Sequence, residues 1–155
     1  MICRSVTIQK QKLDDLYRKA SLLAANPEML AHWSRYLCVL TSGFIEQSVR
    51  AIYSEYAHRK SPVHLSRYVQ IQLNRFQNPT FGNILNLAAA FSSEWEDELK
   101  TTIDDETKDA VNSIVSNRHN IAHGRDVGIT MHILQRYYDR AVKILELIDE
   151  QCNRP

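Results

Sequence analysis

One arginine and two histidines stand close together in the segment Asn117-Arg118-His119-Asn120-Ile121-Ala122-His123-Gly124. Arginine binds phosphate through a planar guanidinium fork, and histidine transfers protons near neutral pH. Arg118 precedes His123 by five positions. Together these side-chain types can hold a phosphodiester and move the proton of a neighbouring hydroxyl, which is the chemistry of metal-free RNA cleavage.

The segment has the pattern of the C-terminal end of an amphipathic helix. Its apolar series is Val111, Ile114, Val115, Ile121 and Ala122. Position 118 falls on this stripe, where leucine would be the ordinary residue. An unpaired buried charge is costly, so Arg118 must either be paired or face a cleft. The structural alternative is an arginine that joins two helices through a buried carboxylate such as Glu46.

The two reactive side chains do not share one face of a straight helix. Arg118 and His123 point roughly 140° apart on an ideal helix. Either His123 lies in a loosened last turn beside Gly124, or the site combines residues from two helices or two chains. A histidine at a helix end can also act simply as a favourable charge near the negative end of the helix dipole.

His119 and His123 lie four positions apart and share a helical face. A metalloprotease helix needs His-Glu-x-x-His, and Asn120 occupies the glutamate position. No third ligand is evident at helical spacing, so we expect no metal site and no cofactor. The sequence also contains neither a glycine-rich phosphate loop nor a Gly-x-Ser-x-Gly elbow, which argues against P-loop NTPases and α/β-hydrolases.

Composition is that of an ordinary globular protein. The 155 residues are 44% hydrophobic and 24% charged, and they predict a single domain over residues 1–155. Four glycines and four prolines are too few for a turn-rich all-β fold. The formal net charge is only +1, so nucleic-acid binding would require a local basic patch rather than the field of the whole chain.

Cys3, Cys38 and Cys152 are far apart and form no Cys-x-x-Cys pair. They indicate reduced intracellular thiols rather than a disulfide framework or a zinc site. The N-terminus lacks the apolar stretch of a secretory signal, and the most apolar run, from Leu85 to Phe91, is too short to span a membrane. We therefore expect a cytoplasmic protein without a membrane partner.

Helical periodicity and helix-start signals continue along the whole chain. Asn26-Pro27 and Ser61-Pro62 both combine a capping residue with proline, and Thr130 is predicted to cap the last helix. The predicted helices cover residues 8–25, 27–58, 62–76, 81–100, 104–124 and 130–152. The sequence therefore predicts an all-α, up-and-down bundle of five or six helices. Small residues at positions 42, 43 and 48 permit close approach of another helix.

The segment from Arg118 to Gly124 resembles the signature of HEPN domains, in which a short spacer separates an arginine from a histidine and a polar residue follows the arginine. His119 fills that polar position. The family carries the motif near the end of a late helix, before a final packing helix, as here. Residues 42–50 and 78–81 look most similar to the RiboL-PSP-type HEPN branch of predicted ribonucleases.

This resemblance implies a symmetric homodimer whose two motifs face one cleft and cleave RNA without a metal ion. Arg118 and His123 would be its catalytic residues. The implied partners are RNA, a second copy of the chain, and an antitoxin or associated regulatory protein. Toxin, phage-defence and RNA-repair roles follow from the family analogy alone.

The second tier of site residues comprises His119 and Asn120, which would orient substrate or arginine, and Arg125, which would contact RNA backbone. Glu46 would correspond to the family's second-helix acid, although it lies on the flank of its helix's apolar stripe. The alternative function is a HEPN-like module that binds RNA or protein without cutting it.

Overall fold

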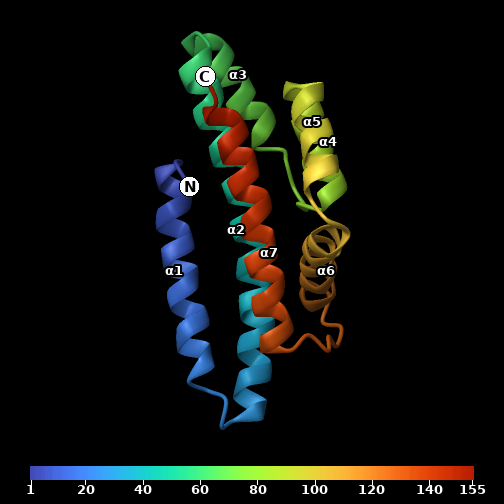
Figure 1. Cartoon of the computed structure of the whole chain (residues 1–155). Helices are drawn as coiled ribbons and strands as arrows, with labels where there is room; N and C mark the ends of the chain where they lie inside the picture. The colour runs from blue at the N-terminus through green and yellow to red at the C-terminus, as the bar shows by residue number, and fades with distance from the viewer.

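The computed structural model describes all 155 residues and contains helices joined by turns, without strands (Figure 1). The all-helical prediction is confirmed, but the helices number seven rather than five or six. They are α1 (Arg4–Ser21), α2 (Pro27–Lys60), α3 (Val63–Leu73), α4 (Phe81–Phe91), α5 (Ser93–Thr102), α6 (Asp105–Ala122) and α7 (Met131–Asn153).

The additional helix arises because the predicted fourth helix, residues 81–100, is broken at Ser92. This residue is extended, with φ −160° and ψ 128°, and its hydroxyl accepts a hydrogen bond from the Trp95 amide at 3.4 Å. Ser92 thus ends α4 and caps α5. The apolar period continues through the break, which is why the pattern alone predicted one helix.

Most other helix ends follow the predicted signals. The side chain of Asn26 caps α2 and that of Thr130 caps α7. The prediction for Ser61 was wrong, because its hydroxyl donates to the Ala57 carbonyl at 2.6 Å and so closes α2. Pro62 then occupies the position before α3 without a side-chain cap.

α1 begins and ends four residues earlier than predicted, and its start depends on a distant partner. The carboxylate of Asp149, on α7, accepts hydrogen bonds from the amides of Ile2 and Cys3, the latter at 3.2 Å. Asp149 is only 2% exposed. It satisfies the amides of the two residues directly before α1, where the N-cap residue Cys3 makes no side-chain capping bond.

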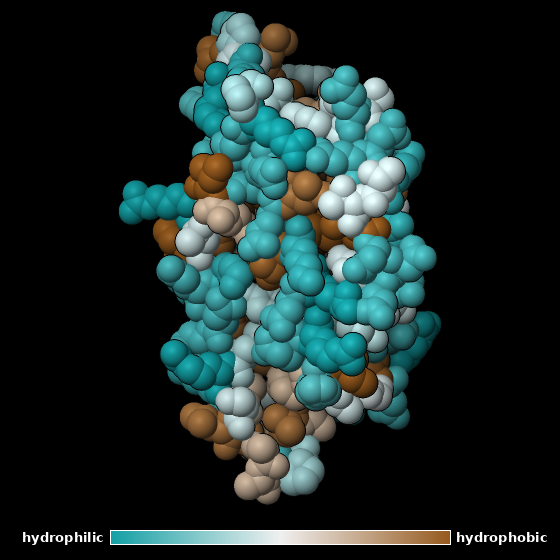
Figure 2. All heavy atoms as spheres, in the orientation of Figure 1, coloured by the Kyte–Doolittle hydropathy of each residue, from teal (hydrophilic) through white to brown (hydrophobic).

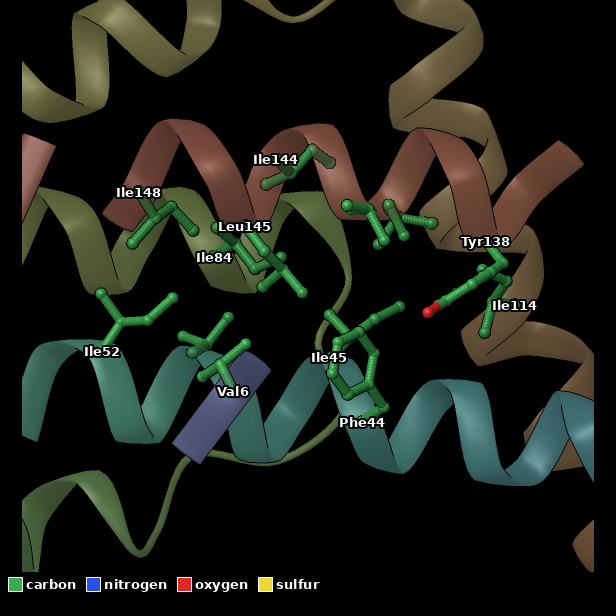
Figure 3. Close-up of a cluster of buried hydrophobic side chains, with 14 of the residues drawn as sticks. Val6, Phe44, Ile45, Ile52, Ile84, Ile114, Tyr138, Ile144, Leu145 and Ile148 are labelled. Carbon is green, nitrogen blue, oxygen red and sulfur yellow. The ribbon is translucent and has the colours of Figure 1, made fainter. Parts of the chain in front are cut away.

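α2 lies at the centre of the bundle and packs against α1, α3, α6 and α7, while α4 and α5 form a helical hairpin. One hydrophobic core draws buried residues from all seven helices. Figure 3 shows Ile52 of α2 and Ile148 of α7 pointing toward one another within this core. α2 and α7 form a central pair of helices. α6 packs on both of them, and the pair therefore positions α6.

Aromatic contacts fasten α1 to the central pair. Tyr17 of α1 stacks on Tyr138 of α7 with ring centroids 4.8 Å apart. The Tyr17 hydroxyl lies 2.6 Å from the Thr41 hydroxyl of α2, and the Tyr138 hydroxyl donates to Asp14 at 2.6 Å. Because both tyrosines are buried, their hydrogen bonds specify one register of α1 on its neighbours.

Hydrophilic residues cover most of the face shown in Figure 2, and hydrophobic residues appear there in small groups. One such group lies at the turn between α1 and α2, where Leu22 and Met29 are exposed. None of the helices combines the length and apolar character that a membrane crossing requires.

The cysteines Cys3, Cys38 and Cys152 are free and buried. Burial raises the pKa of the Cys38 thiol to about 11 and that of Cys152 to about 12. These two groups therefore stay protonated near neutral pH and pack as small apolar side chains.

Two glycine substitutions should change stability in opposite directions. Gly124→Ala should lower the free energy of unfolding by about 1 kcal/mol, because φ at Gly124 is 68°. Gly43→Ala should raise it by up to about 1 kcal/mol, because a Cβ added to this helical residue meets nothing within 4 Å. Urea unfolding followed by circular dichroism measures both, and shifts of the same sign would contradict the assigned backbone roles.

Candidate functional site

α6 carries the Arg–His segment on a helix fixed at both ends. At its start, the Asp104 side chain accepts a hydrogen bond from the Thr107 amide at 2.7 Å. Its buried face contains Ala110, Val111, Ile114 and Val115. Arg118 follows on the same stripe and is half-buried.

Arg118 forms one wall of a groove between α1 and α2, which we call the Arg118 groove. The groove has a volume of about 530 Å³. Its apolar wall consists of Leu13, Leu16, Val39, Leu40 and Phe44. The polar lining residues are Gln9, Lys12, Ser42, Glu46 and Gln47, with Gly43 between them.

The guanidinium of Arg118 forms no hydrogen bond or ion pair within the chain. By contrast, Arg50, Arg140 and Arg154 are all paired with carboxylates. A half-buried cation without an internal partner is available to an anionic ligand, and a planar guanidinium suits phosphate in particular.

The predicted turn at Gly124 is confirmed and has the geometry of a Schellman motif. The amide of Gly124 donates to the Ile121 carbonyl at 3.0 Å, and the amide of Arg125 donates to the Asn120 carbonyl at 2.9 Å. The Arg125 guanidinium also donates to the Asn120 side chain at 3.2 Å. Asn120 and Arg125 are therefore brought together, and their visible role is to close α6.

His119 and His123 are exposed at this end of α6, and their ring centroids lie 4.4 Å apart. His123 is the C-cap residue, with φ −95° and ψ 13°. The adjacent rings provide two groups that can donate or accept a proton. No hydrogen bond or ion pair joins either ring to Arg118, so the arginine and the two histidines form no bonded unit within one chain.

Glu46 lines the Arg118 groove but does not bind Arg118. Its carboxylate pairs with Arg50 at 2.9 Å and accepts a hydrogen bond from the Asn78 amide at 3.1 Å. Arg50 donates in turn to the Phe76 carbonyl at 2.9 Å. The suggested Arg118–Glu46 ion pair is therefore wrong, because Glu46 and Arg50 together hold the α3–α4 turn against α2.

Several lining residues were missed by the sequence analysis. The spacing of Glu46 and Arg50, four positions apart on a helix, was a usable signal for an ion pair. Gln9 and Lys12 gave no such signal, because their place in the groove depends on how α1 packs.

No group of three or more His, Cys, Asp or Glu side chains comes together where it could hold a metal ion.

The all-helical architecture and the Arg-x4-His segment before a final helix define the class of protein as a HEPN domain. The model of the RiboL-PSP-HEPN family matches residues 5–154, which is nearly the whole chain. The chain belongs to this family. Among curated proteins and among solved structures, nothing matches it significantly.

The different partners of two arginines predict different effects on stability. Arg50→Ala should lower the free energy of unfolding by about 1–3 kcal/mol, because it removes charge-assisted bonds to Glu46 and Phe76. Arg118→Ala should change it by less than about 1 kcal/mol, because no internal partner is lost. Urea unfolding measures both, and an equal cost for Arg118→Ala would mean that its guanidinium is held within the fold.

Proposed function

We propose that this chain is a metal-independent endoribonuclease that acts as a homodimer. The observation that carries the proposal is the unpaired Arg118, half-buried beside a groove and followed by His119 on the same helix and by His123 at its C-cap. Membership of the RiboL-PSP-HEPN family supports it, because HEPN domains are often ribonucleases. Toxin, defence or RNA-repair roles, with an antitoxin as regulator, are extensions of this proposal.

In the proposed reaction, the ribose 2′-hydroxyl attacks the adjacent phosphorus. His123 accepts the hydroxyl proton while the new O–P bond forms. The bond to the 5′-oxygen breaks, and the partner's His123 protonates that oxygen as it leaves. Arg118 holds the phosphate and stabilises the charge that develops on its oxygens. The products are a 2′,3′-cyclic phosphate and a 5′-hydroxyl.

Dimerisation would bring Arg118 and His123 of different subunits to one phosphate, since no hydrogen bond joins them within one chain. Two copies arranged around one cleft would let the Arg118 guanidinium of one subunit and the exposed histidines of the other meet the same phosphate. His119 would then orient substrate beside His123. Arg125 would contact RNA backbone from the turn, and Asn120 would support it through their hydrogen bond.

The second candidate function is a HEPN-like module that binds RNA or protein without cutting it. The absence of a hydrogen bond between Arg118 and His123 in one chain favours it, because binding needs only the cation. A titration of RNA across salt concentrations measures this activity, since each phosphate contact adds to the salt dependence.

Cleavage of labelled RNA in excess EDTA tests the catalytic proposal. Wild-type protein should yield 2′,3′-cyclic phosphate and 5′-hydroxyl ends, and His123→Ala should reduce the rate by about 10²–10⁴-fold. Arg118→Ala should be similarly impaired because it loses charge stabilisation. His64→Ala and Arg67→Ala, which remove exposed residues of α3, are matched controls and should cleave normally.

Two results would contradict this chemistry. Equal cleavage of RNA with a 2′-deoxy group at the cut site would exclude attack by the 2′-hydroxyl. A wild-type rate for His123→Ala, in a preparation free of contaminating nuclease, would remove His123 from the mechanism. RNA binding without cleavage would favour the second candidate function.

The dimer proposal predicts that specific activity falls on dilution in parallel with the fraction of dimer. The physical reason is that the proposed site takes Arg118 from one subunit and His123 from the other. Light scattering and sedimentation, measured over the concentration range of the cleavage assay, provide the comparison. Full activity from a monomer would refute the composite site while leaving the nuclease assignment intact.

A further inference from the structure

Gly43 has no structural reason to be glycine within this chain. It lies inside α2, where glycine costs about 1 kcal/mol relative to alanine. Its backbone is helical, and a Cβ added there would meet nothing within 4 Å. Neither conformation nor internal packing therefore requires glycine. Gly43 lines the Arg118 groove, and because glycine has no side chain it leaves open space there.

The walls beside Gly43 are suited to a flat, largely apolar group. Leu13 and Leu16 of α1 line one side, and Val39 and Leu40 of α2 line the other. A volume of about 530 Å³ lies within the usual range for small-molecule and cofactor sites. A nucleobase has apolar faces that such side chains contact and a polar edge that needs hydrogen-bonding partners.

The polar residues of the groove have free hydrogen-bonding capacity. The side chains of Gln9, Lys12 and Gln47 are exposed and form no hydrogen bond or ion pair within the chain. A glutamine amide can both donate to and accept from a base edge, and a lysine ammonium can contact a phosphate. Glu46 is already engaged with Arg50 and Asn78, so it is not free to neutralise Arg118.

We propose that the Arg118 groove is a base-binding subsite for RNA. The nucleobase next to the phosphate held by Arg118 lies over Gly43 and against the apolar wall, and Gln9 and Gln47 contact its edge. This inference rests on the proposed function, because it takes the phosphate as the ligand of Arg118. It makes Gly43 and Gln47 determinants of which base flanks the cut.

The positive charge of the Arg118 groove favours RNA over a second copy of the chain as its occupant. A helix packed onto Gly43 would bury the Arg118 guanidinium, which would then require a carboxylate from the incoming helix. An RNA strand supplies a phosphate beside every base and so neutralises the guanidinium itself. The free ammonium of Lys12 adds positive charge to the same groove, which also favours a polyanion.

The test fills the groove at Gly43 and removes the base from the substrate. Gly43→Leu puts a side chain of good helix propensity into the open space. Gly82→Leu is the matched control, because Gly82 is also helical and exposed, has no atom within 4 Å of an added Cβ, and does not line the groove. The substrates are a short RNA with one mapped cut site and the same RNA made abasic on either side of that site.

Wild-type protein and Gly82→Leu should lose about tenfold or more in kcat/KM when one flanking base is removed, the scale of base-stacking contributions. On intact RNA, the kcat/KM of Gly43→Leu should already be about tenfold or more below that of the wild type. Removing the flanking base should not lower it further. If Gly43→Leu fails to fold, Gln47→Ala should still change the relative kcat/KM for RNAs with different flanking bases. Wild-type behaviour of either folded variant would overturn the proposal.

Binding of an uncleavable 2′-deoxy analogue, followed by fluorescence anisotropy, separates this inference from the proposed function. If affinity depends on the flanking base and is lost in Gly43→Leu, but RNA is not cleaved, the subsite is supported and the nuclease is rejected. Cleavage that ignores the flanking base would keep the nuclease and reject the subsite. A change of oligomeric state in Gly43→Leu, seen by sedimentation, would instead assign the groove to contact between copies and overturn the proposal.

Discussion

Packing of α2 against α7 is the constraint on which the rest of the structure depends. α1, α3 and α6 all pack on α2, and α6 also packs on α7. Fully buried aliphatic side chains such as Ile45 and Leu145 each stabilise the fold by roughly 1.5–3 kcal/mol through burial. The site residue Arg118 is therefore positioned by a core to which it does not belong, so chemistry at position 118 can vary with little effect on the fold.

The other wall of the groove is set by polar contacts that cross the bundle. Asp149 binds the amides of Ile2 and Cys3, and the Tyr138 hydroxyl binds Asp14. Both interactions join α1 to α7, although they line no part of the groove. They fix α1 along and around its axis, and so determine which α1 side chains face Arg118. The shape of the candidate site is thus a consequence of helix register across the whole bundle.

The predictable parts of this protein were those governed by local rules. Burial of Val111, Ile114 and Val115 on α6 and the left-handed residue Gly124 follow from periodicity and from glycine's backbone freedom, and both were predicted. Ala122, at the end of the predicted stripe, is exposed. The break at Ser92 was missed because a serine cap competes with a helix pattern that continues through it. The predicted ion-pair partner of Glu46 was wrong, and the groove residues contributed by α1 were not predicted. Both depend on tertiary contacts. Asp149 and Ile2, for example, are 147 positions apart.

Two departures from local rules coincide at the Arg118 groove. Gly43 weakens an exposed helix position where alanine would fit, and Arg118 places a cation on a partly buried stripe without a partner. The neighbouring pair Glu46 and Arg50 is fully engaged, so neither of these charges is free to balance Arg118. Natural proteins tend to break such rules where function requires it. The proposed RNA ligand, which needs both space and positive charge, would account for the two departures together, whereas folding requirements account for neither.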